Sequence, residues 1–381
     1  MEKKKRNILG DYLKRSDTLL LGLCIAATVF GIVLIASATR HTGSHQYIYV
    51  QLIALILGIF LYFLFSVIDL DILADHWKLL FIFSVLLIGS LVFLGVEGDT
   101  GNRAWIRFAG IGVQPAEVVK IPFIILLAKF VVHAKNSRGL NHPVSVIEIA
   151  LFVLFLSGLI IVVSRDLGSA LVYLFVFIVV MFAAGTNILW FLFGAGAVAA
   201  AFPLLWEHFL SEGQKNRILA PYDPSVDPTG LGITWQANQS KAAISGGGFL
   251  GQGLFSGNYT QAGSVSQQHT DFIFSVVGEE LGFIGCAAVI LLLLLIILRC
   301  IQTGVRSNDP LGMLVSIGFA AMLIFQTFEN IGMCIGLTPV IGLTLPFFSY
   351  GGSSLVMLYA AMGIVSGVKM RPKPASFVRQ F

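Results

Sequence analysis

Charged residues and cysteines are both scarce in this chain of 381 residues. Aspartate, glutamate, lysine and arginine together make up only 12% of the sequence, and there are four cysteines. Each cysteine falls within or at the edge of an apolar stretch, so neither a disulfide framework nor a zinc site is indicated. The cysteines are expected to act as small apolar packing residues. Chemistry in this chain must therefore come from its few ionisable side chains.

Apolar residues make up 56% of the chain, and the mean hydropathy is +0.87. The apolar residues gather in runs of about 20, each long enough to cross a hydrocarbon layer of about 30 Å. This pattern predicts an all-α polytopic membrane protein with about ten transmembrane helices. The predicted spans are Thr18–Ala38, Ile48–Ile68, Leu79–Val96, Pro115–Val132, Val146–Val163, Gly168–Ala184, Ile188–Phe209, Phe272–Leu298, Leu311–Leu337 and Pro346–Gly367. The first run is longer than the core of a cleaved signal, so we expect a retained helix.

The distribution of basic residues predicts the orientation. If the N-terminus is cytoplasmic, about two thirds of the 24 lysines and arginines lie on the cytoplasmic side, as the positive-inside rule requires. An even number of spans then places both termini in the cytoplasm. The expected regions are a cytoplasmic tail (1–17), a membrane domain (18–367) with a large extracytoplasmic loop between helices 7 and 8 (210–271), and a cytoplasmic tail (368–381). This asymmetry accounts for the net charge of +4, so no nucleic-acid partner is expected.

The polar, glycine-rich loop 210–271 interrupts an otherwise apolar chain and ends in His269-Thr270-Asp271. A polar stretch of this length is unusual in such a protein unless a polar substrate is handled there. We therefore expect the chemistry at its end. Asp271 is a candidate base, although aspartate is also favoured as the N-cap of a following helix. His269 is a candidate substrate contact or a packing residue.

Several ionisable residues lie at other predicted outer helix ends. Glu117 and Lys120 are three residues apart and share one helical face. Each would cost on the order of 3 kcal/mol if unpaired in the hydrocarbon centre, so they form a structural ion pair or contact a substrate or metal. Arg103 is a candidate phosphate contact or a lipid headgroup contact. Arg165 and Asp166 either cap a turn or line the same cavity.

The motifs of this chain resemble those of the SEDS family, which serves bacterial shape, elongation, division and sporulation and includes RodA, FtsW and SpoVE. The resemblance rests on Gln114-Pro115-Ala116-Glu117 with Lys120, Arg165-Asp166-Leu167-Gly168, Gln239-Ser240-Lys241-Ala242, His269-Thr270-Asp271-Phe272, Gly278-Glu279-Glu280-Leu281-Gly282 and Pro346-Phe347-Phe348-Ser349-Tyr350-Gly351-Gly352-Ser353-Ser354. It extends from the second helix to the last. Asn330-Ile331-Gly332-Met333 is closer to the RodA members. Two departures are Ser266-Gln267-Gln268, where the family commonly has Leu-Pro-Glu, and Ala116, where it commonly has serine.

The resemblance implies a peptidoglycan glycosyltransferase that polymerises lipid II on the outer face of the bacterial cytoplasmic membrane. It also implies a class B penicillin-binding protein as the transpeptidase partner. In this reaction a sugar hydroxyl attacks an anomeric carbon while a polyprenyl pyrophosphate leaves. A carboxylate that takes the hydroxyl proton accelerates such a step by about 100- to 10,000-fold, and Asp271 is the candidate for this role.

The leaving pyrophosphate requires positive charge nearby. The expected substrate-binding residues are Arg103, Glu117, Lys120, Arg217, Gln239, Ser240, Lys241, His269 and Ser353. Glu117 is also a candidate ligand for Mg²⁺ or Mn²⁺, because these ions prefer oxygen ligands. Two alternatives stay open at this point: a flippase for a lipid-linked oligosaccharide, and a noncatalytic scaffold for the penicillin-binding protein.

Overall fold

The computed structural model describes residues 15–96, 103–108, 111–208 and 210–371. The predicted tails therefore lie largely outside the described residues. The helices and strands, in chain order, are α2 (Thr18–Ala38), η1 (Arg40–Thr42), α3 (Gln46–Val67), α4 (Leu70–Asp75), α5 (Trp77–Gly89), α6 (Leu91–Leu94), β1 (Gly95–Val96), β2 (Trp105–Phe108), β3 (Ile111–Val113), α7 (Pro115–Asn136), α8 (Pro143–Ser164), α9 (Leu167–Ala184), α10 (Ile188–His208), α11 (Glu212–Leu219), η2 (Pro224–Val226), α12 (Trp235–Gly247), α13 (Asn258–Gln261), α14 (Ile273–Arg306), α15 (Pro310–Cys334) and α16 (Gly352–Met370).

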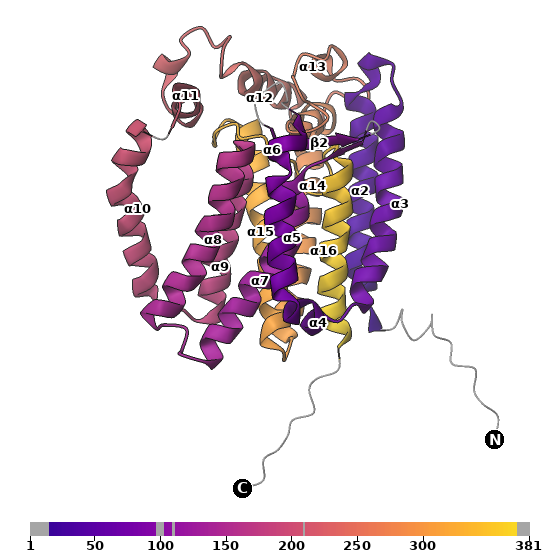
Figure 1. The fold of residues 1–381 in the computed structure, drawn as a ribbon. Helices are drawn as coiled ribbons and strands as arrows, with labels where there is room; N and C mark the ends of the chain where they lie inside the picture. The colour runs from indigo at the N-terminus through magenta and orange to yellow at the C-terminus, as the bar shows by residue number, and fades with distance from the viewer. Residues whose placement is uncertain (1–14, 97–102, 109–110, 209, 372–381) are drawn as a thin grey trace, which may run out of the picture.

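The long helices form a bundle, and the short elements α11, α12 and α13 gather over one end of it (Figure 1). Nine helical segments in the described part of the chain are long and apolar enough to cross a membrane, with α5 and α6 forming one segment. The one predicted span outside these nine is the fourth, which corresponds to α7, and there Glu117, Lys120, Lys129 and Lys135 interrupt the apolar sequence. Because Glu117 and Lys120 are buried against other helices, these two charged groups are kept from lipid. The predicted helical membrane fold is confirmed.

One small sheet was not predicted. Strands β1, β2 and β3 pair antiparallel in that order, with Trp105 opposite Val96 and Ile106 opposite Val113. The sheet lies directly before α7, at the end of the bundle that carries the short helices (Figure 1). It thus belongs to the same end as the polar loop.

The eighth predicted span differs most from expectation. Instead of one continuous helix from Phe272, α14 is interrupted at Gly282, whose φ of 63° and ψ of −158° are not helical. The backbone of residues 248–253 fills the interruption, because Gln252 N–H donates to the Glu279 carbonyl and Phe283 N–H donates to the Gly248 carbonyl. These bonds satisfy groups that the break removes from the helical ladder. The continuous part of this span is therefore residues 283–306.

The glycines of the 246–251 stretch explain this close approach. A Cβ atom at Gly247 would meet the Gly278 carbonyl oxygen, and one at Gly251 would meet the Glu280 carbonyl oxygen. Gly251 also has a φ of +82°, which L side chains rarely adopt. The stretch is thus a packing element that seats the outer loop on α14.

Glu279 and Glu280 hold that loop through their side chains. Glu279 accepts hydrogen bonds from the Tyr259 and Thr260 N–H groups at 2.7 and 2.8 Å, and Glu280 accepts from Ser37 Oγ at 2.7 Å. Both carboxylates are fully buried. Their role is structural, because all of these partners belong to the protein.

Candidate active site

The backbone of Asp271 is fixed by a buried amide on α15. Asn330 Nδ2 donates to the Asp271 carbonyl oxygen at 2.7 Å and to the Leu343 carbonyl oxygen at 2.7 Å. Leu343 belongs to the α15–α16 loop, which comprises residues 335–351. One side chain thus joins the end of the large polar loop to the α15–α16 loop.

Two further bonds join the same segments. Ser349 Oγ donates to the Thr270 carbonyl at 2.6 Å, and Tyr350 N–H donates to the His269 carbonyl at 2.8 Å. Gln51 of α3 donates to the Ser349 carbonyl at 3.2 Å. Residues 269–271 are therefore held in one position before any substrate arrives, as preorganised catalysis requires.

The Asp271 carboxylate contrasts with its backbone, because no hydrogen bond or ion pair from another described residue engages it. Burial, and then the negative charge of Asp166, raises the pKa of Asp271 to about 6. Gly342 lies beside it: a Cβ atom there would be 3.4 Å from Asp271 Oδ2. The alternative N-cap role is wrong, since the N-cap of α14 is Phe272 and no side chain caps it.

Asp166 performs the capping role that the sequence left open. Its carboxylate accepts from the Ser169 N–H at 2.9 Å and from Ser169 Oγ at 2.7 Å, at the start of α9. Gln114, next to the start of α7, donates to the same carboxylate at 2.9 Å. Because its charge also reaches Asp271, Asp166 contributes to the electrostatics of the candidate base as well.

Glu117 and Lys120 form the buried ion pair that their spacing predicts, at 2.5 Å between Lys120 Nζ and Glu117 Oε1. The other Glu117 oxygen accepts from Ser354 Oγ at 3.3 Å. Ser354 is thus the serine that the first turn of α16 directs at this pair, and the substrate contact predicted for Ser353 stays a prediction. The hydroxyl of Ser353 is buried without a hydrogen-bond partner in the described part of the chain.

His269 packs between two aromatic rings. Its ring centroid lies 4.8 Å from that of Tyr47 and 5.7 Å from that of Tyr350. Burial, and then the charge of His41, lowers the pKa of His269. The imidazole is therefore neutral at pH 7, and its observed contacts are those of a packing residue.

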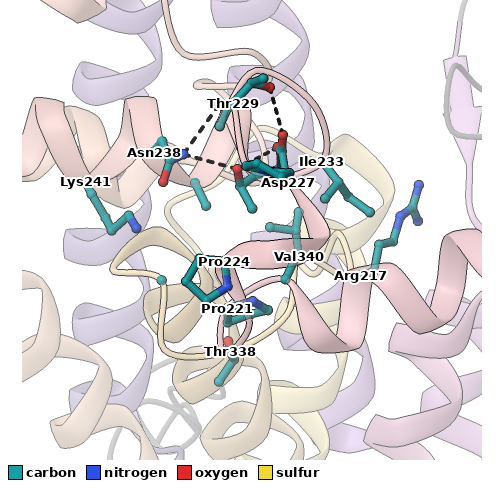
Figure 2. Close-up of a pocket in the computed structure, with 16 residues that line it drawn as sticks. Arg217, Pro221, Pro224, Asp227, Thr229, Ile233, Asn238, Lys241, Thr338 and Val340 are labelled. Carbon is teal, nitrogen blue, oxygen red and sulfur yellow. Dashed lines mark hydrogen bonds between the residues drawn. The ribbon is translucent and has the colours of Figure 1, made fainter.

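Arg217 and Lys241 line a separate hollow of about 360 Å³ in the outer part of the molecule. They lie on opposite sides of it in the view of Figure 2. Asp227 organises one wall, because its carboxylate accepts from Thr229 Oγ1 at 3.1 Å and from Thr234 Oγ1 at 2.7 Å. Thr338 and other residues of the α15–α16 loop complete the hollow. The loop that borders Asp271 thus also borders these two cations.

The remaining predicted contacts are dispersed. Ser240 is fully buried and donates to the Cys334 carbonyl at 2.8 Å, which makes it a packing contact between α12 and α15. Gln239 is half-buried on α12, and Arg103 is exposed directly before β2. The structure therefore places the other predicted residues around Asp271, around Glu117 and around the hollow of Figure 2, while Arg103, Gln239 and Ser240 lie outside these groups.

The residues near Glu117 do not by themselves fit a metal ion. No group of three or more His, Cys, Asp or Glu side chains suited to a metal occurs in the described ranges. Glu117 is already engaged by Lys120 and Ser354. A Mg²⁺ ion usually takes few protein carboxylates and completes its octahedron with water and substrate phosphate. The requirement for Mg²⁺ or Mn²⁺ stays a prediction, and no catalytic step is assigned to it.

Asn330, Ser349 and Gly342 were not predicted as parts of the site. The sequence indicated only that Asn330 faces the bundle, because an amide in a membrane helix is costly in lipid. Its two hydrogen bonds, to the Asp271 carbonyl and the Leu343 carbonyl, depend on how the α15–α16 loop returns over α15. Such a return has no local sequence signal.

Comparison with known proteins supports the resemblance. A family model described as cell cycle protein, and named for FtsW, RodA and SpoVE, matches residues 17–373. The chain is 35% identical to a probable peptidoglycan glycosyltransferase FtsW of Trichlorobacter lovleyi, over 94% of this chain and 96% of that protein. It is 32% identical to the peptidoglycan glycosyltransferase MrdB of Escherichia coli, over 78% of each.

Solved structures agree with this assignment. A chain in a peptidoglycan synthase complex that coordinates polymerization and crosslinking aligns with a TM-score of 0.79 and 33% identity, covering 93% of this chain and 97% of that one. The rod shape determining protein RodA of Thermus thermophilus aligns with a TM-score of 0.68 and 30% identity, covering 93% and 96%. The fold, the motifs and the family model all lead to one assignment: this chain belongs to the FtsW, RodA and SpoVE family, the SEDS proteins.

Proposed function

We propose that this chain polymerises lipid II into glycan strands, with Asp271 as the general base. Membership of the family makes the chain a peptidoglycan glycosyltransferase and an integral bacterial membrane protein. The observation that carries the assignment of the base is the environment of Asp271. Its backbone is fixed by Asn330, while its half-buried carboxylate has no described partner and a pKa of about 6.

In the proposed reaction, a sugar hydroxyl forms a C–O bond with the anomeric carbon of a second lipid-linked disaccharide. The bond between that carbon and the pyrophosphate oxygen breaks, and polyprenyl pyrophosphate leaves with the bonding electrons. Asp271 accepts the hydroxyl proton. A single displacement inverts the anomeric centre, so the base and the leaving group lie on opposite sides of the sugar ring. A base with a pKa near 6 is mostly ionised at pH 7 yet still basic enough to take the proton.

Positive charge for the leaving pyrophosphate is proposed to come from Lys120 and from the cations of the hollow in Figure 2. Arg217 and Lys241 line that hollow together with residues of the α15–α16 loop, the loop that Asn330 joins to Asp271. A cation near developing phosphate charge lowers the barrier without moving a proton. Arg103 remains a candidate contact at the membrane surface.

The proposed orientation places Asp271 on the extracytoplasmic side. Arg299 and Lys369 pair with Asp17, directly before α2. Asp271 lies between α13 and α14, and α13 is one of the short helices over the other end of the bundle (Figure 1). Concentration of basic residues at the Asp17 end is typical of the cytoplasmic side. With this orientation, both termini are cytoplasmic.

The proposed partner is a class B penicillin-binding protein, and the proposed role is cell-wall elongation. Support for a partner comes from the similarity to a chain of a peptidoglycan synthase complex. Relatives named FtsW and MrdB both match, so the choice of elongation over division rests on the RodA-like sequence around Asn330.

Polymerisation of purified lipid II by the chain with its partner tests the proposal. Asp271→Ala is expected to lower the rate by about 100- to 10,000-fold while partner binding and thermal stability are retained. Asp223→Ala is a matched control, because Asp223 is an exposed aspartate of the same outer segment that caps a local turn. Full polymerisation by Asp271→Ala would exclude Asp271 as the base.

The same preparation distinguishes the alternatives. A flippase would move lipid II across a liposome without joining sugars, and a scaffold would leave all polymerisation to the partner. The partner alone is therefore assayed beside the complex. Glycan strands that require both this chain and its Asp271 carboxylate agree only with the proposed function.

A further inference from the structure

A second hollow lies at the opposite end of the bundle from Asp271. It has a volume of about 170 Å³ and lies where α14 ends, α15 begins and α16 ends. Its wall consists of Arg299, Gln302, Thr303, Arg306, Ser307, Asn308, Asp309, Val368, Lys369 and Arg371. The proposed transferase reaction uses none of these residues.

The wall carries four cationic side chains and a single carboxylate. That carboxylate, on Asp309, is committed to the backbone, because it accepts from the Leu311 N–H at 3.2 Å and the Gly312 N–H at 2.7 Å at the start of α15. Asp309 therefore serves as a helix cap and is poorly placed to neutralise the cations.

Acidic residues behind the wall compensate part of this charge. The fully buried Asp17 pairs with both Arg299, at 2.8 Å, and Lys369, at 3.3 Å. One carboxylate thus forms ion pairs with two cations. The charge on this side of the hollow remains positive.

The side of the hollow at Arg371 is better balanced. Arg371 lies 3.4 Å from the Asp69 carboxylate and donates to the Ile68 carbonyl at 3.2 Å. Asp71 also interacts electrostatically with Arg371. Arg306 is different: it is exposed in the last turn of α14 and has no hydrogen-bond or ion-pair partner among the described side chains. The uncompensated charge therefore lies between Arg306, Arg299 and Lys369.

We propose that this hollow binds the phosphate of an anionic phospholipid headgroup, with Arg306 as its main contact and Arg299 and Lys369 beside it. A guanidinium presents paired N–H donors that match phosphate oxygens. The Asn308 and Gln302 amides supply neutral donors on the same wall. Basic pockets between transmembrane helices on the cytoplasmic side suit such headgroups.

The position of the hollow favours a lipid as the source of the phosphate. It lies at the ends of three membrane-crossing helices, where headgroups surround the protein (Figure 1). A bound headgroup would relieve repulsion between the cations and fasten the α14–α15 turn to the membrane surface. A diffuse basic surface would satisfy the positive-inside rule equally well, but it would not need cations from the ends of both α14 and α16 around one hollow.

Binding of phosphatidylglycerol to the purified full chain, measured by native mass spectrometry in detergent, tests this proposal. Arg306→Gln is expected to lower the affinity about fivefold, the effect of one basic residue near an anionic surface. Arg306→Glu is expected to lower it further. Arg138→Gln is the matched control, because Arg138 is an exposed arginine at the same end of the bundle that pairs with Glu148 at 3.0 Å. This control should bind as the unmodified chain does.

Two further binding measurements identify the source of the phosphate. Phosphatidylcholine should bind equally to all variants, and inorganic phosphate at millimolar concentration should not displace phosphatidylglycerol. Equal loss of phosphatidylglycerol from the Arg306 and Arg138 variants would overturn the site. Complete displacement by inorganic phosphate would overturn the assignment to a lipid.

Discussion

The amide of Asn330 donates to the Asp271 carbonyl and to the Leu343 carbonyl, each at 2.7 Å, and so fixes the backbone of the candidate base. Asn330 is fully buried and its own oxygen has no partner in the described part of the chain. It has no described contact with the Asp271 carboxylate. Asn330 is therefore a positioning residue rather than a catalytic one.

Asn330→Ala is expected to lower kcat by roughly 10- to 100-fold with little change in KM, since a displacement of about 1 Å at a base costs on this order. Steady-state kinetics of lipid II polymerisation measures kcat and KM separately and so checks this expectation. Gln326→Met is the control: Gln326 lies one turn earlier on α15, and its buried oxygen has no described partner. A large rise in KM for Asn330→Ala, with kcat unchanged, would contradict the positioning role.

Sequence reasoning predicted the helical membrane fold because long apolar runs and charge asymmetry report directly on the bilayer. It also predicted the Glu117–Lys120 pair, which follows from helical spacing alone. It was wrong about a continuous eighth helix from Phe272, because the break at Gly282 depends on the return of residues 248–253, which pair with α14. Long-range hydrogen bonds of this kind leave no local periodicity.

In the candidate site, too, some features were predictable from the sequence and others were not. Asp271 was predicted from its motif, and its half-buried carboxylate without a described partner agrees with the proposed role. Ser353 was predicted to contact substrate, which stays a prediction, whereas the contact of the neighbouring Ser354 with Glu117 was not predicted. Adjacent residues on a helix differ by about 100° in direction, so a shift of one residue decides which side chain faces the pair.

The pKa of Asp271 predicts the acid side of the pH–rate profile. The carboxylate is the active form and its pKa is raised to about 6, so activity should fall as the pH drops through about 6. Asp166→Asn removes a negative charge near Asp271 and should therefore lower its pKa. We expect the acid limb of kcat/KM to move to lower pH by about half to one unit.

A matched substitution isolates this electrostatic effect. Asp223→Asn changes an exposed carboxylate of the outer segment and should leave the acid limb in place. Asparagine at position 166 retains an oxygen that can accept from the Ser169 N–H, so the cap of α9 is largely preserved. A shift of the limb to higher pH in Asp166→Asn would contradict the proposed coupling.

The seating of the outer loop on α14 predicts a sharp effect of one methyl group. Gly251→Ala introduces a Cβ atom against the Glu280 carbonyl and places alanine at a φ of +82°. The strained backbone alone costs on the order of 1–3 kcal/mol, and the clash adds to it. We expect a thermal midpoint several degrees lower, together with greater protease cleavage of the 246–261 segment. Gly213→Ala on α11 meets no atom within 4 Å and should change neither measurement.

The buried Glu117–Lys120 pair allows its structural and catalytic roles to be separated. Both side chains are almost fully buried, so Lys120→Met alone leaves Glu117 without its cation and should destabilise the protein by about 3–5 kcal/mol. Glu117→Gln with Lys120→Met removes both charges, and it should recover most of that stability because no unpaired ion remains.

The double variant then reports on catalysis in a folded protein. If Lys120 stabilises the leaving pyrophosphate, Glu117→Gln/Lys120→Met should fold normally, bind the partner and still polymerise lipid II at least 100-fold more slowly, a loss of about 2.7 kcal/mol in transition-state stabilisation. Thermal midpoints of the two single variants and the double variant complete the cycle. Recovery of both stability and polymerisation in the double variant would show that the pair is structural alone, which would leave Arg217 and Lys241, in the hollow bordered by the α15–α16 loop, as the proposed cations.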